Sequence, residues 1–343
     1  MIELLKNRSV ISVTGADALK FLQGMTTNDL ENHQNSYNYL LSPQGKYLHD
    51  FFVSKVSDAE LLIDIDYSCA GAFIQKLNLY KLRRAVQLED LSDDYCVVYS
   101  KSSFQTTRHP EEVGLAPTWG SHEMSPTAPL NDGYITSYQD PRFHKLGFRS
   151  IIKASYVNSL ELISNDVCSN SCCHSRESGN PCFCVVKTIK NCIFLDPPVK
   201  PEDDNGNCCN LYKQDKYEFA IPDGVSDLIY DRSIPLHFGG EELSAISFTK
   251  GCYVGQEVIS RAKYQGVIRK KIFKIKSDVQ ISFHEIGAEI TDINGDKIGI
   301  FCSSYNNLGI VLLDEEKYLE LDKKIGIIDG ADRVEIILPE WRE

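Results

Sequence analysis

Apolar and polar positions along the first half of the chain form short runs that predict strands separated by two helices. Residues 10–13 are a β-prone run, and a helix is expected from Asp17 to Gln23, ending at Gly24. Strands are expected over residues 47–56 and 60–66, and a helical period follows over residues 69–84. Strand character resumes at 86–88 and 96–99, so the order of elements predicts an α+β region over about residues 50–150.

The last part of the chain has a different pattern, in which short strand-like runs alternate with turns. These runs cover residues 268–275, 288–293, 297–302, 309–313 and 334–338, and Asn294-Gly295 between two of them is a hairpin signal. The pattern predicts a small all-β domain, either a barrel or a sandwich. A polar run over residues 106–131, rich in Pro and Gly, predicts a loop.

Strict alternation in the strand expected at 47–56 places Asp50 on the same face as Leu48 and Phe52. An acid between two apolar residues is costly unless it has a partner. Two interpretations are open: the carboxylate is tied to backbone donors, or it is available to a ligand.

Length and charge restrict the classes of function. The chain has 343 residues, enough for two or three domains, and a formal net charge of −12 that repels nucleic acid and anionic membranes. We expect a cytoplasmic protein, because neither a signal peptide nor an apolar run of about 18 residues is visible. One segment has the opposite sign, with Glu257 as its single acid against seven cations, at Lys250, Arg261, Lys263, Arg269, Lys270, Lys271 and Lys274. It is either a solvated face or a site for a polyanion.

Eight of the twelve cysteines fall within residues 168–209, whose composition differs from that of the rest of the chain. A cytoplasmic protein keeps its thiols reduced, so these cysteines do not predict a disulfide framework. Their spacings also lack the paired Cys-x-x-Cys units of zinc knuckles, so no metal site is predicted. We interpret this segment as a poorly ordered insertion.

The densest group of reactive side chains lies in residues 247–266. Gly255 precedes a short helical pattern, which would place Cys252 at or near a helix N-terminus, with Lys250 two residues before it. A helix dipole and an ammonium both favour a thiolate. The alternative is that Cys252 is a small buried residue without a chemical role.

The stretch Lys250-Gly-Cys-Tyr-Val-Gly-Gln-Glu resembles the signature of the YgfZ branch of the glycine-cleavage T-protein superfamily. These are folate-binding proteins linked to the maintenance of iron–sulfur enzymes and to tRNA modification, and their mitochondrial relatives are iron–sulfur assembly factors. Further stretches match in the same order along nearly all of the chain except residues 168–209, namely residues 14–24, 27–29, 43–46, 140–142, 146–149 and 263–267.

The resemblance implies an α+β fold of three domains in a ring around a central folate site, with a C-terminal all-β barrel. It assigns a discontinuous folate-site domain to residues 1–49 and 210–266, an α+β domain to residues 50–167, the insertion to 168–209 and the barrel to 267–343.

The resemblance also implies functional residues. Asp50 matches the folate-side aspartate of the T-protein and Cys252 matches the functional thiol, while His49 replaces the first acid of the T-protein pair, which weakens the case for aminomethyl transfer. Phe219 and Ala220 depart from the Arg-Gly of many relatives. The remaining candidates for binding, or for holding the thiol, are Lys250, Tyr253, Gln256, Glu257 and Arg261.

We therefore expect a tetrahydrofolate-binding protein that supports the assembly or repair of iron–sulfur enzymes, including tRNA-modifying enzymes, through Cys252. Its expected partners are those client enzymes, and whether it is itself an enzyme is left open. Two alternatives remain: an aminomethyltransferase acting with folate, and an RNA-binding accessory protein recognised through the basic segment.

Overall fold

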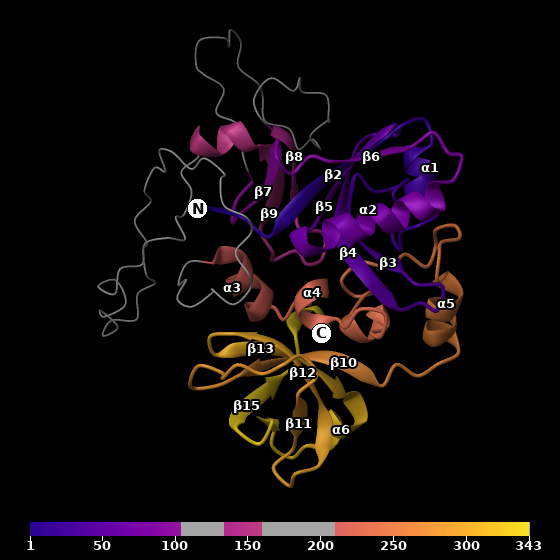
Figure 1. Ribbon diagram of the computed structural model, residues 1–343. Helices are drawn as coiled ribbons and strands as arrows, with labels where there is room; N and C mark the ends of the chain where they lie inside the picture. The colour runs from indigo at the N-terminus through magenta and orange to yellow at the C-terminus, as the bar shows by residue number, and fades with distance from the viewer. Residues whose placement is uncertain (104–133, 160–209, 343) are drawn as a thin grey trace, which may run out of the picture.

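A computed structural model describes residues 1–103, 134–159 and 210–342 (Figure 1). The loop predicted over 106–131 and the cysteine-rich insertion over 168–209 lie outside these residues. No helix in the described ranges is long and apolar enough to cross a membrane.

The first half of the chain builds a five-stranded antiparallel sheet in the order β3-β4-β5-β2-β6. Its strands are β2 (Arg8–Thr14), β3 (Asn35–Leu41), β4 (Tyr47–Ser57), β5 (Glu60–Asp66) and β6 (Gln87–Asp90). Helices α1 (Ala18–Gln23) and α2 (Tyr67–Lys81) cover one face, and their apolar residues share a core with this sheet (Figure 1). Alternation along the strands supplies that core, because every second residue faces the helices.

The helix predicted over residues 69–84 starts two residues earlier and ends three residues earlier than expected. Its N-cap is Asp66, whose carboxylate accepts from the backbone N–H of Ser68, and it ends at Lys81. Leu82 adopts φ 49° and ψ −117°, outside the helical region, and the N–H of Arg84 donates to the carbonyl of Lys81 at 3.0 Å. A tight turn therefore replaces the last part of the predicted helix.

A second antiparallel sheet has the order β1-β7-β9-β8. It consists of β1 (Ile2–Leu4), β7 (Tyr95–Ser100), β8 (Tyr134–Gln139) and β9 (Phe148–Lys153), followed by the 3-10 helix η2 (Ala154–Ser159). The predicted domain boundary between residues 49 and 50 falls inside β4, and strands on both sides of that point belong to the first sheet.

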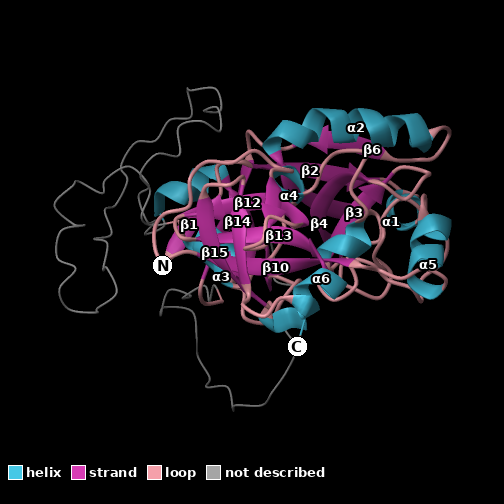
Figure 2. Ribbon diagram, turned by 90° about the horizontal axis from the view of Figure 1, so that it is seen from below, coloured by secondary structure: helices cyan, strands magenta, loops and turns pink. Residues whose placement is uncertain are grey.

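Residues 210–266 connect the sheets to the barrel and lie between them (Figure 1). Figure 2, seen from below, shows the strands of the barrel overlapping those of the sheets. They form α3 (Leu211–Glu218), α4 (Gly224–Asp227), the 3-10 helix η4 (Pro235–Phe238) and α5 (Gln256–Tyr264). Residues from this segment, from β3 and β4 and from the barrel form one shared hydrophobic core. The connecting segment is therefore packed on both sides.

The C-terminal domain is a closed six-stranded antiparallel barrel in the order β10-β13-β12-β11-β14-β15, which confirms the predicted all-β barrel. Its strands are β10 (Lys270–Lys276), β11 (Glu289–Thr291), β12 (Lys297–Tyr305), β13 (Leu308–Asp314), β14 (Ile325–Ile328) and β15 (Asp332–Ile337). Pairing of β15 with β10 closes the barrel, so no edge strand is left open. Helix α6 (Glu315–Glu320) and the 3-10 helix η5 (Glu340–Arg342) complete it.

Candidate functional site

Asp50 lies on β4 and is 5% exposed. The phenol of Tyr37 donates to its Oδ2 at 2.8 Å, and the phenol of Tyr47 donates to its Oδ1 at 2.9 Å. Its partners are therefore side-chain hydroxyls, not the backbone donors that the sequence offered as one alternative. Tyr37 and Tyr47 belong to an aromatic-rich core that also contains Tyr39 and Phe52.

The start of α4 covers the Asp50 carboxylate. A Cβ atom on Gly224 would lie 1.7 Å from Asp50 Oδ1 and 2.1 Å from the hydroxyl of Tyr47. Only a residue without a side chain allows α4 to approach β4 this closely. In this state of the protein, the carboxylate is closed off by the connecting segment.

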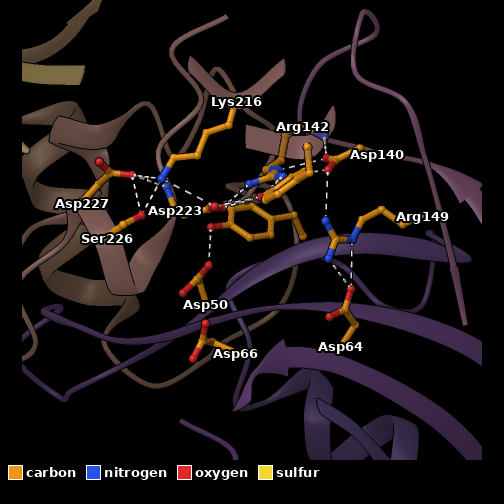
Figure 3. Close-up of polar contacts among 12 residues, drawn as sticks. Asp50, Asp64, Asp66, Asp140, Arg142, Arg149, Lys216, Asp223, Ser226 and Asp227 are labelled. Carbon is orange, nitrogen blue, oxygen red and sulfur yellow. Dashed lines mark hydrogen bonds and ion pairs between the residues drawn. The ribbon is translucent and has the colours of Figure 1, made fainter. Parts of the chain in front are cut away.

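A buried network of charges surrounds this site (Figure 3). The carboxylate of Asp64 forms ion pairs with Arg8 and with Arg149, the latter at 2.7 Å. Arg142 forms an ion pair with Asp140 at 2.7 Å. The network has four cations and five carboxyls, contributed by Arg8, Arg142, Arg149 and Lys216 and by Asp50, Asp64, Asp140, Asp223 and Asp227. One carboxyl is therefore in excess.

The surroundings of Asp50 differ from those of the other carboxyls whose pKa is shifted. Burial, reinforced by the charge of Asp223, raises the pKa of Asp50. Burial also opposes ionisation of Asp64 and Asp223, but their cationic neighbours hold both pKa values below the usual range. Asp50 therefore differs from Asp64 and Asp223, because its surroundings favour the protonated form of the carboxyl.

Asp223 and Asp227 extend the network towards the barrel. Arg142 Nη1 binds Asp223 at 2.8 Å, Lys216 Nζ binds Asp227 at 2.8 Å, and the Ser303 hydroxyl of β12 donates to Asp227. Lys216 also contacts the hydroxyl of Ser226. Burial opposes its charge, yet Asp227 and its other anionic neighbours raise the pKa of Lys216 well above the usual value, so this lysine cannot act as a base towards the serine.

Cys252 was expected at or near a helix N-terminus, and it lies near one but outside the first turn of the helix. Gly255, with φ 84°, is the N-cap of α5, and the helix begins at Gln256, four residues after the cysteine. A turn in which the N–H of Gln256 donates to the carbonyl of Tyr253 separates them. Cys252 instead lies exposed on the preceding loop. The helix dipole falls off within one turn, so it supplies no activation of this thiol.

Lys250 is buried, and its ammonium does not serve as the expected neighbour of the thiol. Nζ donates to three backbone carbonyls at the end of α1 and in the following loop, those of Gln23 at 2.7 Å, Thr26 at 2.8 Å and Asn28 at 2.7 Å. Burial lowers the pKa of Lys250 to about 8. The lysine thus fastens the Cys252 loop to α1.

Tyr253 is buried, in contrast to its exposed neighbour Cys252. Its ring is buried in the core that contains Tyr37 and Tyr47, and its hydroxyl has no hydrogen-bond partner among the described residues. The ammonium of Lys250 lies 5.2 Å from the ring centroid. Tyr253 therefore links the cysteine loop to the aromatic surroundings of Asp50.

The remaining candidates lie on the surface of α5. Glu257 and Arg261 form an exposed ion pair at 2.6 Å, and Gln256 is half-buried at the start of the helix. The structure does not bring this ion pair to Asp50, whose polar contacts are described above. An exposed pair of this kind contributes little to stability.

The basic segment is less positive than its sequence indicates, because acids from other segments pair with it. Lys263 binds Glu241, Lys271 binds Glu315 at 3.1 Å, and Lys274 binds Glu218 at 2.9 Å. With Glu257 bound to Arg261 and Lys250 bound to carbonyls, Arg269 and Lys270 are the members of the segment without such partners in the described ranges.

Several residues around Asp50 were not identified from the sequence. Tyr37 and Tyr39 alternate with polar residues, which was a usable signal for β3, but nothing in the sequence marks Tyr37 as a partner of Asp50. Gly224 carries no signal in the sequence that marks it as a neighbour of Asp50. Asp140 and Arg142 were singled out only because residues 140–142 resemble a stretch of the family.

Replacing Gly224 with Ala tests the close approach of α4. We expect Gly224→Ala to lower the free energy of unfolding by about 1–3 kcal/mol, because the new methyl group overlaps Asp50 and Tyr47. Urea unfolding of Gly251→Ala is the control, because a Cβ at Gly251 meets nothing within 4 Å. Equal losses in the two variants would contradict the close contact.

His49 lies on the opposite face of β4, with its ring 5.8 Å from that of Phe73 and 5.7 Å from that of Tyr230. Burial, with a smaller contribution from Lys76, lowers the pKa of His49 to about 4. The unfolded chain therefore binds a proton that the folded protein does not bind, and stability falls as the pH drops from about 6.5 to 4.

We expect His49→Phe to remove part of this acid sensitivity. Between pH 7 and pH 4 the variant should gain up to about 3 kcal/mol relative to the unsubstituted protein, measured by urea unfolding at each pH. A stability difference that does not change with pH would show that His49 is not held neutral.

Comparisons with known proteins agree with this architecture. The GCVT N-terminal domain family matches residues 5–99. The chain is 26% identical over 358 residues to the human mitochondrial iron–sulfur cluster assembly factor IBA57, covering 98% of this chain and 84% of that protein. For the Mus musculus protein of the same name, the identity is 25% over 334 residues, covering 91% and 77%.

A solved structure also matches, that of the glycine cleavage system aminomethyltransferase T from Bartonella henselae. Its TM-score is 0.59 at 12% sequence identity, over 98% of this chain and 84% of that one, which establishes a shared fold. Residues 5–99 thus match the GCVT N-terminal domain family, the chain shares the fold of the aminomethyltransferase T structure, and nearly its whole length is similar to mitochondrial iron–sulfur cluster assembly factors.

Proposed function

We propose that this protein is an iron–sulfur cluster assembly factor that supports iron–sulfur enzymes, including tRNA-modifying ones, with Cys252 as the group that meets the cluster or the client. The observation that carries this proposal is the similarity to named assembly factors over 98% of the chain, which includes the segment with Cys252. We expect it to act in the cytoplasm on proteins of the iron–sulfur machinery.

The placement of the described cysteines supports a role for Cys252. Cys96 and Cys302 are buried and Cys69 is half-buried, whereas Cys252 is exposed. Burial raises the pKa of Cys69 to about 11 and that of Cys96 to about 12, which disfavours the thiolate form that binds metals. Cys252 is open to a partner, and Lys250 fastens its loop to the fold.

We also propose that tetrahydrofolate binds beside Asp50. The carboxyl of Asp50 and the aromatic rings of Tyr37, Tyr39 and Tyr253 suit the polar edge and the flat face of a pterin ring. Space is the limiting factor, because Gly224 lies against the carboxylate. Binding there therefore requires that α4 move away from β4.

The two alternatives have less support. Aminomethyl transfer would use the position of His49, but this side chain is neutral near pH 7 and lies on the face of β4 turned towards α2. RNA binding would use the basic segment, most of whose cations are bound by acids or carbonyls. Neither alternative gains an observation from the structure.

The role of Cys252 is tested in cells whose own copy of the gene is deleted. We expect Cys252→Ser to restore less than a tenth of the iron–sulfur enzyme activity that the unsubstituted chain restores, because serine is a poor ligand for iron. Cys69→Ser is the matched control and should restore full activity. Full activity with Cys252→Ser would overturn the proposed role of this thiol.

Folate binding is tested by titration calorimetry with tetrahydrofolate. We expect saturable binding that weakens at least tenfold in Asp50→Asn. The control is Asp66→Asn on the neighbouring strand, because asparagine keeps the N-cap of α2. No saturable heat, or equal affinity in Asp50→Asn, would remove the folate part of the proposal without affecting the part that rests on Cys252.

A further inference from the structure

A second surface stands out at the C-terminal end of α2, where two leucines are exposed. Leu79 is 73% exposed and Leu82 is 85% exposed. We call this surface the α2-end patch and define it by six residues from α1, α2 and the turn after α2: Lys20, Leu79, Lys81, Leu82, Arg83 and Arg84.

The cations of the α2-end patch lack ion-pair partners among the residues that the structure describes. None of its four basic side chains forms an ion pair within the described ranges, in contrast to the segment from Lys250 to Lys274. Two acids lie nearby: the carboxylate of Asp17 accepts from the backbone N–H of Ala85 at 2.9 Å, and the carbonyl of Asp58 accepts from the N–H of Leu19 at 3.2 Å. In a chain with a net charge of −12, the patch is a local surface of opposite sign.

Leu82 is held in a backbone conformation that disfavours a leucine. Its φ of 49° and ψ of −117°, with the hydrogen bond from Arg84 N–H to the carbonyl of Lys81, correspond to the first central residue of a type II′ turn. Glycine is the usual residue at that position. A strained and exposed leucine costs stability without packing in the core, which is the pattern of a residue kept for a contact outside the chain.

The α2-end patch and the Cys252 loop pack on the same short helix. The guanidinium of Arg84 lies 5.6 Å from the centroid of the Phe21 ring in α1. At the end of α1, the carbonyl of Gln23 accepts from Lys250 Nζ, and the carbonyl of Gly24 accepts from the N–H of Val254. The six residues of α1 span about 9 Å. Figure 1 shows α1, the end of α2 and α5 on one side of the molecule.

We propose that the α2-end patch is the docking surface for a protein that presents carboxylates around an apolar pocket, and that docking there places this protein beside Cys252. The inference rests on the proposed function, since the partner is then a member of the iron–sulfur machinery that meets the thiol. Leu82 is the apolar anchor, and Lys20 and Arg83 select for the acidic rim.

A protein with an acidic surface fits the α2-end patch better than nucleic acid or an anionic membrane does. Nucleic acid would engage the cations, but phosphates and sugars offer no pocket for Leu79 and Leu82. An anionic bilayer would accept both leucines, but two leucines on one turn give little apolar area for stable insertion. A protein pocket with an acidic rim uses the leucines and the cations together.

The first test separates stability from binding at Leu82. We expect Leu82→Gly to unfold at the same urea concentration as the unsubstituted chain or a higher one, because glycine accepts this turn conformation. In cells whose own copy is deleted, the same variant should restore at most a tenth of the iron–sulfur enzyme activity. Full activity in Leu82→Gly would overturn the proposal.

The second test reverses charge with a matched control. The test variant combines Lys20→Glu with Arg83→Glu. The control variant combines Lys6→Glu, beside β1, with Lys153→Glu, on β9, and it changes the net charge by the same amount. We expect the first to lose activity at least tenfold and the second to keep it. Equal activities would overturn the assignment of the α2-end patch.

The third test identifies the occupant. A photoreactive phenylalanine at position 82 of the full chain is cross-linked in cells, and position 319 on α6, where the leucine is 70% exposed, is the control. The proposal is supported if one protein is cross-linked from position 82 and this cross-link disappears in the double variant Lys20→Glu with Arg83→Glu. The same protein must bind the purified chain less tightly as the salt concentration increases. Cross-links to RNA, binding to vesicles containing phosphatidylglycerol, or equal cross-linking from both positions would overturn the proposal.

A wrong function and a wrong docking surface give different results in these experiments. If the proposed function is wrong, the unsubstituted chain itself restores no iron–sulfur enzyme activity in the deleted cells. If only the docking surface is wrong, the unsubstituted chain restores activity and the variants at residues 20, 82 and 83 do so equally.

Discussion

The rest of the structure depends on a continuous line of buried charges that crosses the molecule. It starts where Asp64 of β5 holds Arg8 of β2 and Arg149 of β9, which joins the two sheets. Arg142 then binds Asp223 in the connecting segment, and Asp227 accepts from Ser303 of the barrel. Removing one member of such a set leaves an uncompensated buried charge, which typically costs 3–5 kcal/mol. Three parts of the chain are therefore held in one relative position.

This constraint also explains why the site at Asp50 is closed. Asp223 immediately precedes α4 and Asp227 ends it, so the charges at both ends press Gly224 against β4. Any opening of the site must therefore loosen contacts of Arg142 or Lys216. A ligand that binds at Asp50 competes with these ion pairs, and its binding is coupled to the packing of the barrel through Ser303.

The sequence predicted the fold where local patterns decide it and missed what long-range contacts decide. The barrel and the strand carrying Asp50 follow from alternation, and α1 follows from its apolar spacing and Gly24. The end of α2 did not follow, because Leu82 adopts a turn position that glycine usually occupies. The partners of Asp50 were also missed, because Tyr37 reaches it through the pairing of β3 with β4 and Gly224 reaches it from a distant point of the chain.

The partners of the charged residues could not be predicted from their neighbours in the sequence either. Lys250 looked like a partner of Cys252 because two residues separate them, but its ammonium is satisfied by three carbonyls from residues more than 220 positions away. The basic segment likewise meets Glu218, Glu241 and Glu315, which a local count leaves out. Charge that is paired internally fixes the fold, whereas charge left unpaired is available to a partner. By this criterion, the surface most suited to recognition lies at the end of α2, next to α1, the helix to which the cysteine loop is fastened.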